Sequence, residues 1–174
     1  MTDCSLRRCT PGDELALALV GQATFLETFA GILDGADIIA HCQNQHSPAV
    51  YATWLNRPTA AAWRAETTIG RAPVGYLVLD EPRLPVRDPR PTDIELKRIY
   101  VLSRFQGTGV GGALMDQAVD TARQMGKTRM LLGVYSRNER ALAFYRKRGF
   151  QPVGERRFIV GHNSYEDFVL ALPL

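Results

Sequence analysis

The chain has 174 residues, of which 45% are hydrophobic and 22% charged, and its formal net charge is +3. This length predicts a single domain over residues 1–174 with a buried core, and the composition excludes intrinsic disorder. No apolar run approaches the ~20 residues that cross a bilayer, and the first residues lack a signal-peptide layout. The weak positive charge falls short of a nucleic-acid-binding stripe. We therefore expect a cytoplasmic protein that binds neither membranes nor nucleic acid.

The cysteines do not indicate a disulfide framework or a metal site. There are three, Cys4, Cys9 and Cys42, an odd number without a repeated spacing. Cys42 lies between His41 and His46, but structural zinc requires four converging ligands and no second pair of candidates follows. We expect no bound metal.

The first half of the chain predicts one strand, three helices and a hairpin. A short strand over residues 5–10 precedes a helix that begins at Asp13, and a second helix covers 36–45. A third helix opens with Ser47 as N-cap and Pro48 at its first position. Strands over 60–66 and 73–80 flank a turn. On the first helix, one apolar face is approximated by Leu15, Leu19, Gln22, Ala23, Leu26, Phe29 and Ala30.

The second half alternates strands with helices. A proline-rich loop over 81–91 leads to a strand over 93–102, a glycine-rich turn and a helix that stops at Gly126. A strand over 129–136 precedes a helix with Asn138 as N-cap and Gly149 at its C-terminal cap. Strands over 156–160 and 165–172 join across the turn 161–164. The order β-α-α-α-β-β-β-α-β-α-β-β indicates a mixed sheet with helices packed against it. The helix before Gly126 carries its apolar side on Val110, Ala113, Leu114, Ala118, Ala122 and Met125.

The stretch "RFQGTGVGGALM" places four glycines within six positions, directly before an apolar helix. The first N–H groups of a helix have no internal partner, and the helix dipole makes that end positive. Glycines permit unusual backbone angles and remove Cβ atoms, so a diphosphate could lie against bare amides. The structural alternative is a tight turn with close helix–sheet packing, for which one glycine would suffice. The stretch therefore predicts an anion site.

Neither of two common nucleotide-binding motifs fits this stretch well. Gly107, Gly109 and Gly112 formally match the dinucleotide pattern GxGxxG, which is a weak signal alone. Residues 103–106 separate the strand from the first glycine, and the next strand ends without the acidic residue that would bind a ribose. A Walker loop is excluded, since no Lys-Ser or Lys-Thr pair follows the glycines.

The alternative frame is Gln106-x-x-Gly109-x-Gly111, followed by "NERALAFY" from Asn138 to Tyr145 and by "RKRGF". Together these motifs resemble the GNAT acetyltransferase superfamily, over most of the chain. The resemblance implies a mixed α/β fold: a twisted sheet of about seven strands, flanked by helices, with one splayed parallel strand pair. "TFLETFAGI", "ELKRIYVLSRFQGTGVGGALM" and "LLGVYSRN" are similar, more narrowly, to the PaiA-like polyamine N-acetyltransferases. Ser103 departs from that pattern, in which proline is common.

The resemblance implies that acetyl-CoA lies between the splayed strands. Its pyrophosphate would rest on the amides of residues 106–111, with Gly112 starting the helix, and its pantetheine arm along the strand before the loop. Arg146 and Lys147 would face the 3′-phosphate, or alternatively solvent. The implied cofactor-binding residues are Ile99, Tyr100, Val101, Gln106, Gly107, Thr108, Gly109, Val110, Gly111, Gly112, Asn138 and Tyr145.

The implied reaction is direct attack of an amine on the thioester, without a covalent enzyme intermediate. Glu95 would act as general base, and its alternative is an exposed strand carboxylate. The Val101 N–H would bind the developing oxyanion. Tyr145 would protonate the leaving thiolate as general acid, while the neighbouring Phe144 is expected in the core.

The acceptor is expected to be a small-molecule amine, with a polyamine suggested by the PaiA-like motifs. Other small amines and a protein N-terminus remain alternatives. Two different functions also stay open, an acetyl-CoA sensor without turnover and an NAD(P)-dependent oxidoreductase. A homodimer is a further expectation. The carboxylates expected to line the acceptor pocket are Glu27, Asp34, Asp37, Asp80, Glu81 and Asp93.

Overall fold

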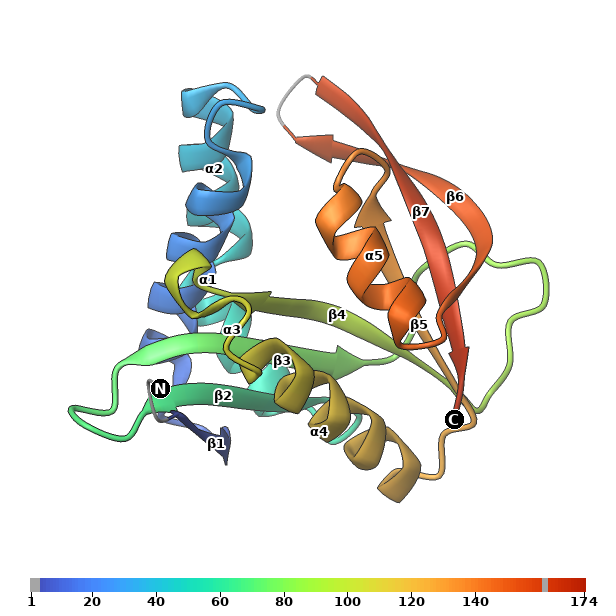
Figure 1. Cartoon of the computed structure of the whole chain (residues 1–174), viewed down its shortest axis with the longest axis horizontal. Coiled ribbons are helices and arrows are strands. Elements are labelled where there is room, and N and C mark those ends of the chain that lie inside the picture. The colour runs from blue at the N-terminus through green and yellow to red at the C-terminus, as the bar shows by residue number, and fades with distance from the viewer. Residues whose placement is uncertain (1–3, 161–162) are drawn as a thin grey trace.

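The computed structural model describes residues 4–160 and 163–174, which form one mixed sheet flanked by helices (Figure 1). The strands are β1 (Cys4–Arg8), β2 (Ala61–Thr67), β3 (Pro73–Asp80), β4 (Asp93–Val101), β5 (Arg129–Tyr135), β6 (Gln151–Val160) and β7 (Asn163–Pro173). The α-helices are α1 (Glu14–Phe29), α2 (Gly35–Gln45), α3 (Pro48–Leu55), α4 (Val110–Gln124) and α5 (Glu139–Lys147), and a 3₁₀ helix spans Ser103–Phe105.

The seven strands are arranged in the order β1-β2-β3-β4-β5-β7-β6. Neighbouring strands pair antiparallel everywhere except between β4 and β5, which are parallel. This confirms the expected α/β class with a mixed sheet and one parallel pair.

Helices cover both faces of the sheet. On one face, Tyr76 and Val78 of β3 pack with α1 and α3. On the other, Leu77 and Leu79 join a larger core that includes side chains of α4 and α5 (Figure 1). Because successive residues of a strand point to opposite faces, the apolar stretch of β3 supplies both cores.

The buried face of α1 differs from the apolar face expected from the sequence. Leu15, Leu19 and Leu26 are 73%, 63% and 53% exposed. The helix is apolar almost all round, so its spacing did not identify the buried side. Small residues decide the packing instead: a Cβ at Gly21 would collide with the side chains of Tyr51 and His46. The residues of α1 that are buried are Leu17, Ala18, Val20, Gly21, Thr24 and Phe25.

The predicted caps of α3 and α5 are confirmed. Ser47 accepts a hydrogen bond from the Val50 amide, with Pro48 at the start of α3. Asn138 caps α5, and Gly149 follows that helix with a φ of +90°.

The last two strands are longer than expected. The pairing of β6 with β7 shifts register between Pro152 and Gly154, so the strand runs through these residues and begins at Gln151. Of the expected turn, Gly161 and His162 lie outside the described residues, and β7 already begins at Asn163.

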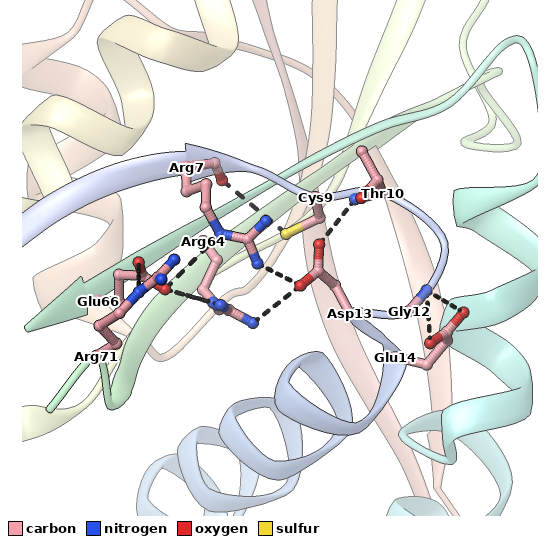
Figure 2. A network of polar contacts seen from close by, with 9 residues as sticks. All are labelled: Arg7, Cys9, Thr10, Gly12, Asp13, Glu14, Arg64, Glu66 and Arg71. Carbon is pink, nitrogen blue, oxygen red and sulfur yellow. Dashed lines mark hydrogen bonds and ion pairs between the residues drawn. The ribbon is translucent and has the colours of Figure 1, made fainter.

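A network of ion pairs joins β1, β2 and the start of α1 (Figure 2). Asp13 accepts from Arg7 and from Arg64, whose Nη1 lies 3.4 Å away. Glu66 accepts from Arg64 at 2.7 Å and from Arg71 at 3.0 Å. These contacts neutralise the buried Arg64 and Glu66, and fix α1 at the sheet edge away from the β4–β5 pair. No helix within the described ranges is long and apolar enough to cross a membrane.

Candidate active site

The parallel strands β4 and β5 are paired at one end only. Asp93, Ile94 and Glu95 pair with residues 129–131, and no pairing follows although both strands continue. Figure 1 shows the two strands diverging beyond this point. This confirms the splayed pair expected from the resemblance and leaves backbone groups of both strands available inside the opening.

Two local features fix this geometry. At the paired end, Arg129 of β5 donates from Nε and Nη2 to the two oxygens of Asp93 of β4, both at 2.7 Å. Along β4, the register with β3 passes from Val78–Arg98 to Leu79–Leu96, so Lys97 is an extra, bulged residue. A bulge bends its strand and increases its twist, which turns the rest of β4 away from β5.

The glycine-rich loop lies at the far end of β4. Gly107 and Gly109 have φ values of +81° and +97°, which favour glycine. A Cβ built on either glycine would meet nothing within 4 Å, so their backbone lies open to the surroundings. The open space supports the anion-site interpretation and not the close-packing alternative for these two positions.

The N-terminus of α4, like that of α1, has no side-chain cap. The helices α2, α3 and α5 each begin with a side chain that accepts a backbone N–H, whereas Gly109 supplies no such cap to α4. The residues therefore fit a bound pyrophosphate, which would accept from these bare amides. The amide of Gln106 is not among them, because it donates to the Ser103 carbonyl at 3.1 Å.

Gly112 has a different physical role from the loop glycines. A Cβ there would lie 2.6 Å from Nη2 of Arg148, whose guanidinium packs over Phe144 and pairs with Asp116. Gly112 thus makes room for an arginine that ties α5 to α4. Packing against Arg148 therefore favours glycine at this position, while the Gly112 amide belongs to the uncapped first turn of α4.

The contacts of Ser103 account for a serine at the position where similar sequences commonly have proline. Its amide donates to Glu27 of α1 at 2.8 Å and its hydroxyl donates to the same carboxylate at 3.1 Å. Proline has no N–H and could not make the first bond. The serine therefore links the glycine loop to α1. Gln106 links the same loop to β4, because its Nε2 donates to the Val101 carbonyl at 2.8 Å.

Tyr145 of α5 lies buried between Phe144 and Phe150, with ring centroids 5.5 and 5.6 Å away. Its hydroxyl has no hydrogen-bond partner in the described part of the chain and is not sealed from solvent. Burial, with a smaller contribution from Tyr100, raises the pKa of Tyr145. The phenol is therefore protonated at neutral pH. Phe144 is only partly buried and packs at the edge of the core.

Glu95 is not an exposed strand carboxylate, since it is only 6% exposed. One of its oxygens, Oε2, accepts from the Arg83 amide at 2.7 Å and from Lys97 Nζ at 2.8 Å. Glu95 lies in the last residue pair before β4 and β5 separate, at the base of the opening.

The expected acidic lining of an acceptor pocket does not form as one cluster. Asp80 pairs with Arg57, Asp93 with Arg129, and Glu27 with Ser103. Asp34 and Asp37 accept from Ala36 and Asn163 respectively, while Glu81 is exposed. Most of these carboxylates have structural partners in the fold.

A buried polar cluster that sequence reasoning missed connects the helices to β4. Arg98 donates to the Tyr51 hydroxyl at 2.8 Å and to the Gln45 carbonyl at 2.6 Å. Tyr51 donates to Tyr76 at 3.1 Å and lies 2.9 Å from Nδ1 of His46. Burial, and then Arg98, lowers the pKa of His46 to about 2, so this histidine is neutral. The cluster holds the outer half of β4 against α2 and α3.

Apart from Tyr145, the predicted cofactor-binding side chains of α5 are either exposed or engaged in capping the helix. Arg146 and Lys147 are exposed on α5. Asn138 accepts from the Ala141 amide at 3.1 Å, so its Oδ1 is engaged in capping α5.

Over residues 4–160 and 163–174, no group of three or more His, Cys, Asp or Glu side chains is arranged to hold a metal ion.

Comparison with known proteins defines the class of protein to which this site belongs. The model of the acetyltransferase (GNAT) family matches residues 31–150, and the chain belongs to that family. It is an acyltransferase that uses acetyl-CoA. An uncharacterised N-acetyltransferase of Mycobacterium tuberculosis is 35% identical over 166 residues, covering 95% of this chain and 99% of the relative.

Solved structures resemble the fold over nearly the whole chain. The PaiA N-acetyltransferase of Thermoplasma acidophilum, solved with coenzyme A, has a TM-score of 0.76 at 18% identity and covers 99% of both chains. The ribosomal-protein-S18-alanine N-acetyltransferase of Escherichia coli has a TM-score of 0.70 at 18% identity, covering 98% of this chain and 94% of that one. At these identities the likeness concerns the fold.

The dinucleotide-binding alternative is wrong. A doubly wound domain requires a largely parallel sheet, and the described sheet contains one parallel pair. The family match accounts for the same glycines as part of an acetyltransferase.

Proposed function

We propose that the protein transfers the acetyl group of acetyl-CoA to a primary amine by direct attack in a ternary complex. The observation that carries this proposal is the opening between β4 and β5, which leads to a loop of bare amides before an uncapped helix. The amides beginning at Gly107 bind the pyrophosphate, and the backbone of residues 99–101 pairs with the pantetheine arm.

Tyr145 is proposed as the general acid that protonates the leaving thiolate. Its support is its place on α5, its unpartnered hydroxyl and the raised pKa, which keeps the proton in place until it is needed. The Val101 N–H is proposed as the oxyanion donor.

Glu95 is proposed as the general base, acting through water. Because Oε2 already accepts from Lys97 and the Arg83 amide, the proton would reach the other oxygen. The carboxylate lies at the base of the opening, where an amine nitrogen that attacks the thioester would lose its proton.

Among amines, polyamines are the first acceptor class to test. The PaiA-like sequence motifs and the likeness to the PaiA fold support this class, whereas the dispersed carboxylates do not. The test measures thiol release from acetyl-CoA with spermidine, simple monoamines and a peptide with an N-terminal alanine. We expect turnover with at least one amine.

Thermal shift separates the alternatives. Acetyl-CoA should raise the melting temperature and NAD(P) should not. Stabilisation by acetyl-CoA without thiol release for any amine would favour the sensor and would overturn the proposed catalysis.

A further inference from the structure

Asp167 of β7 is a buried carboxylate for which the proposed chemistry has no role. It pairs in register with Tyr135 of β5 and with Arg156 of β6, so these three side chains share one face of the sheet. The adjacent Phe168 points to the opposite face, into the core formed with α4 and α5. Asp167 therefore lies on the face covered by α1 to α3, beside the opening.

The carboxylate is held by one oxygen. Arg156 donates from Nε to Oδ2 at 3.1 Å, and its Nη2 forms an ion pair with the same oxygen at 3.1 Å. Its guanidinium fits over Gly133, where a Cβ would come within 2.8 Å, and packs on Phe158 with its Cζ 5.5 Å from the ring centroid. Oδ1 has no partner among the described residues, and it is not sealed from solvent. One hydrogen-bond acceptor therefore remains available.

The positive charge near Asp167 is insufficient for a buried carboxylate. The residue is 5% exposed, and burial raises its pKa even though Arg156 acts in the opposite direction. A second cation beside Oδ1 would stabilise the ionised form.

The sheet register places Asp167 beside the opening, because its partner Tyr135 lies on β5 beyond Leu131, the last residue that pairs with β4. Burial raises the pKa of Tyr100 on β4, and the Asp167 charge adds to that shift. Tyr100 in turn contributes to the raised pKa of Tyr145. Two aromatic rings, Tyr135 and Tyr165, meet on the same face with centroids 5.9 Å apart.

We propose that Oδ1 of Asp167 binds an ammonium group of the acceptor other than the nitrogen that is acetylated, with the rings of Tyr135 and Tyr165 flanking the hydrocarbon chain next to it. This inference rests on the proposed function and names the residue that selects a cationic acceptor. An aliphatic amine with pKa near 10.4 is protonated at neutral pH, so it arrives as the cation that Asp167 lacks. Its aliphatic stem packs against aromatic rings.

The test compares Asp167→Asn with Glu166→Gln, using a diamine or polyamine that the wild-type enzyme acetylates. Asp167→Asn removes the charge and should raise KM for the amine by about 10- to 100-fold, with the Kd of acetyl-CoA unchanged. Glu166 precedes it on β7, is exposed and points to the other face, so Glu166→Gln should match wild type. An unchanged KM in folded Asp167→Asn would overturn the inference while leaving the wild-type acetyltransferase activity established.

Arg156→Gln distinguishes ligand binding from a structural ion pair. Arg156→Gln breaks the ion pair but keeps the carboxylate that would bind the amine, so KM for the amine should rise much less than in Asp167→Asn. Loss of amine affinity in both variants would mean that the ion pair merely supports the fold, and would overturn the inference. Acetylation of monoamines but of no diamine or polyamine would overturn the inference, whereas a wild-type enzyme that acetylates no amine would mean that the proposed function itself fails.

Discussion

Replacing Tyr145 by phenylalanine removes one oxygen from the site and little else. The ring would keep its contacts with Phe144 and Phe150. The hydroxyl has no partner in the described residues, so its loss leaves no buried group unsatisfied. We therefore expect the free energy of unfolding to change by less than about 0.5 kcal/mol.

The effect on turnover should be much larger. A tyrosine with pKa near 10 and a thiol near 8.5 make the proton transfer uphill by about 2 kcal/mol, and burial of Tyr145 widens this gap. A fixed acid that acts as the C–S bond breaks typically contributes 10²- to 10⁴-fold, or about 2.7–5.4 kcal/mol. Tyr145→Phe should lower kcat by this factor.

The assay measures thiol release at saturating amine and acetyl-CoA, with the Kd of acetyl-CoA and a denaturant melt determined on the same preparation. The expected result is a low kcat with both controls unchanged. A kcat within about threefold of wild type would refute the assignment of Tyr145 as the general acid.

Three further predictions concern the loop, the strand clamp and a buried thiol. Gly109→Ala should weaken acetyl-CoA binding at least tenfold, as measured by calorimetry. Gly126→Ala changes another glycine at positive φ and should cost only about 1–2 kcal/mol of stability. Equal losses of acetyl-CoA affinity in the two variants would contradict the claim that the loop amides bind the cofactor. Arg129→Ala should lower the unfolding free energy by about 3–5 kcal/mol at pH 7, because it strands the buried Asp93. Burial opposes ionisation of Asp93, but its hydrogen bonds with Arg129 and the Arg90 amide lower its pKa below the usual 3.8. The stabilisation that ionised Asp93 provides is therefore present above pH 3.8 and is lost as the pH falls through the folded pKa. Denaturant melts of the wild type and Arg129→Ala should show a smaller difference in unfolding free energy at pH 3 than at pH 7. Equal differences at the two pH values would contradict the stabilising role of the Arg129–Asp93 pair. Burial raises the pKa of Cys9 to about 12, so iodoacetamide at pH 8 should leave it unmodified in the folded protein by mass spectrometry; rapid alkylation would contradict its burial.

The features that could be predicted from the sequence are local ones. The caps Ser47 and Asn138 and the glycines at positive φ depend on a few adjacent residues, so their patterns are readable in the chain. The order of strands and helices follows from the same signals. The family motifs then identified the splayed pair.

The features that could not be predicted depend on distant partners. The sequence alone does not show that Asp80 and Asp93 are paired, because the arginines that bind them lie 23 and 36 positions away in the chain. The buried face of α1 was misjudged because contacts with α3, and not periodicity, select Gly21. Asp167 follows Glu166 on β7, and only the register with Tyr135 and Arg156 shows that it faces the opening.

The most direct test of the account is an amide NMR titration of the protein with acetyl-CoA. The backbone N–H resonances of Gly107, Gly109 and Gly111 should shift the most, and pantetheine, which lacks the pyrophosphate, should leave them nearly unmoved. Large shifts elsewhere with these three glycines unaffected by acetyl-CoA would contradict the claim that bare loop amides bind the cofactor.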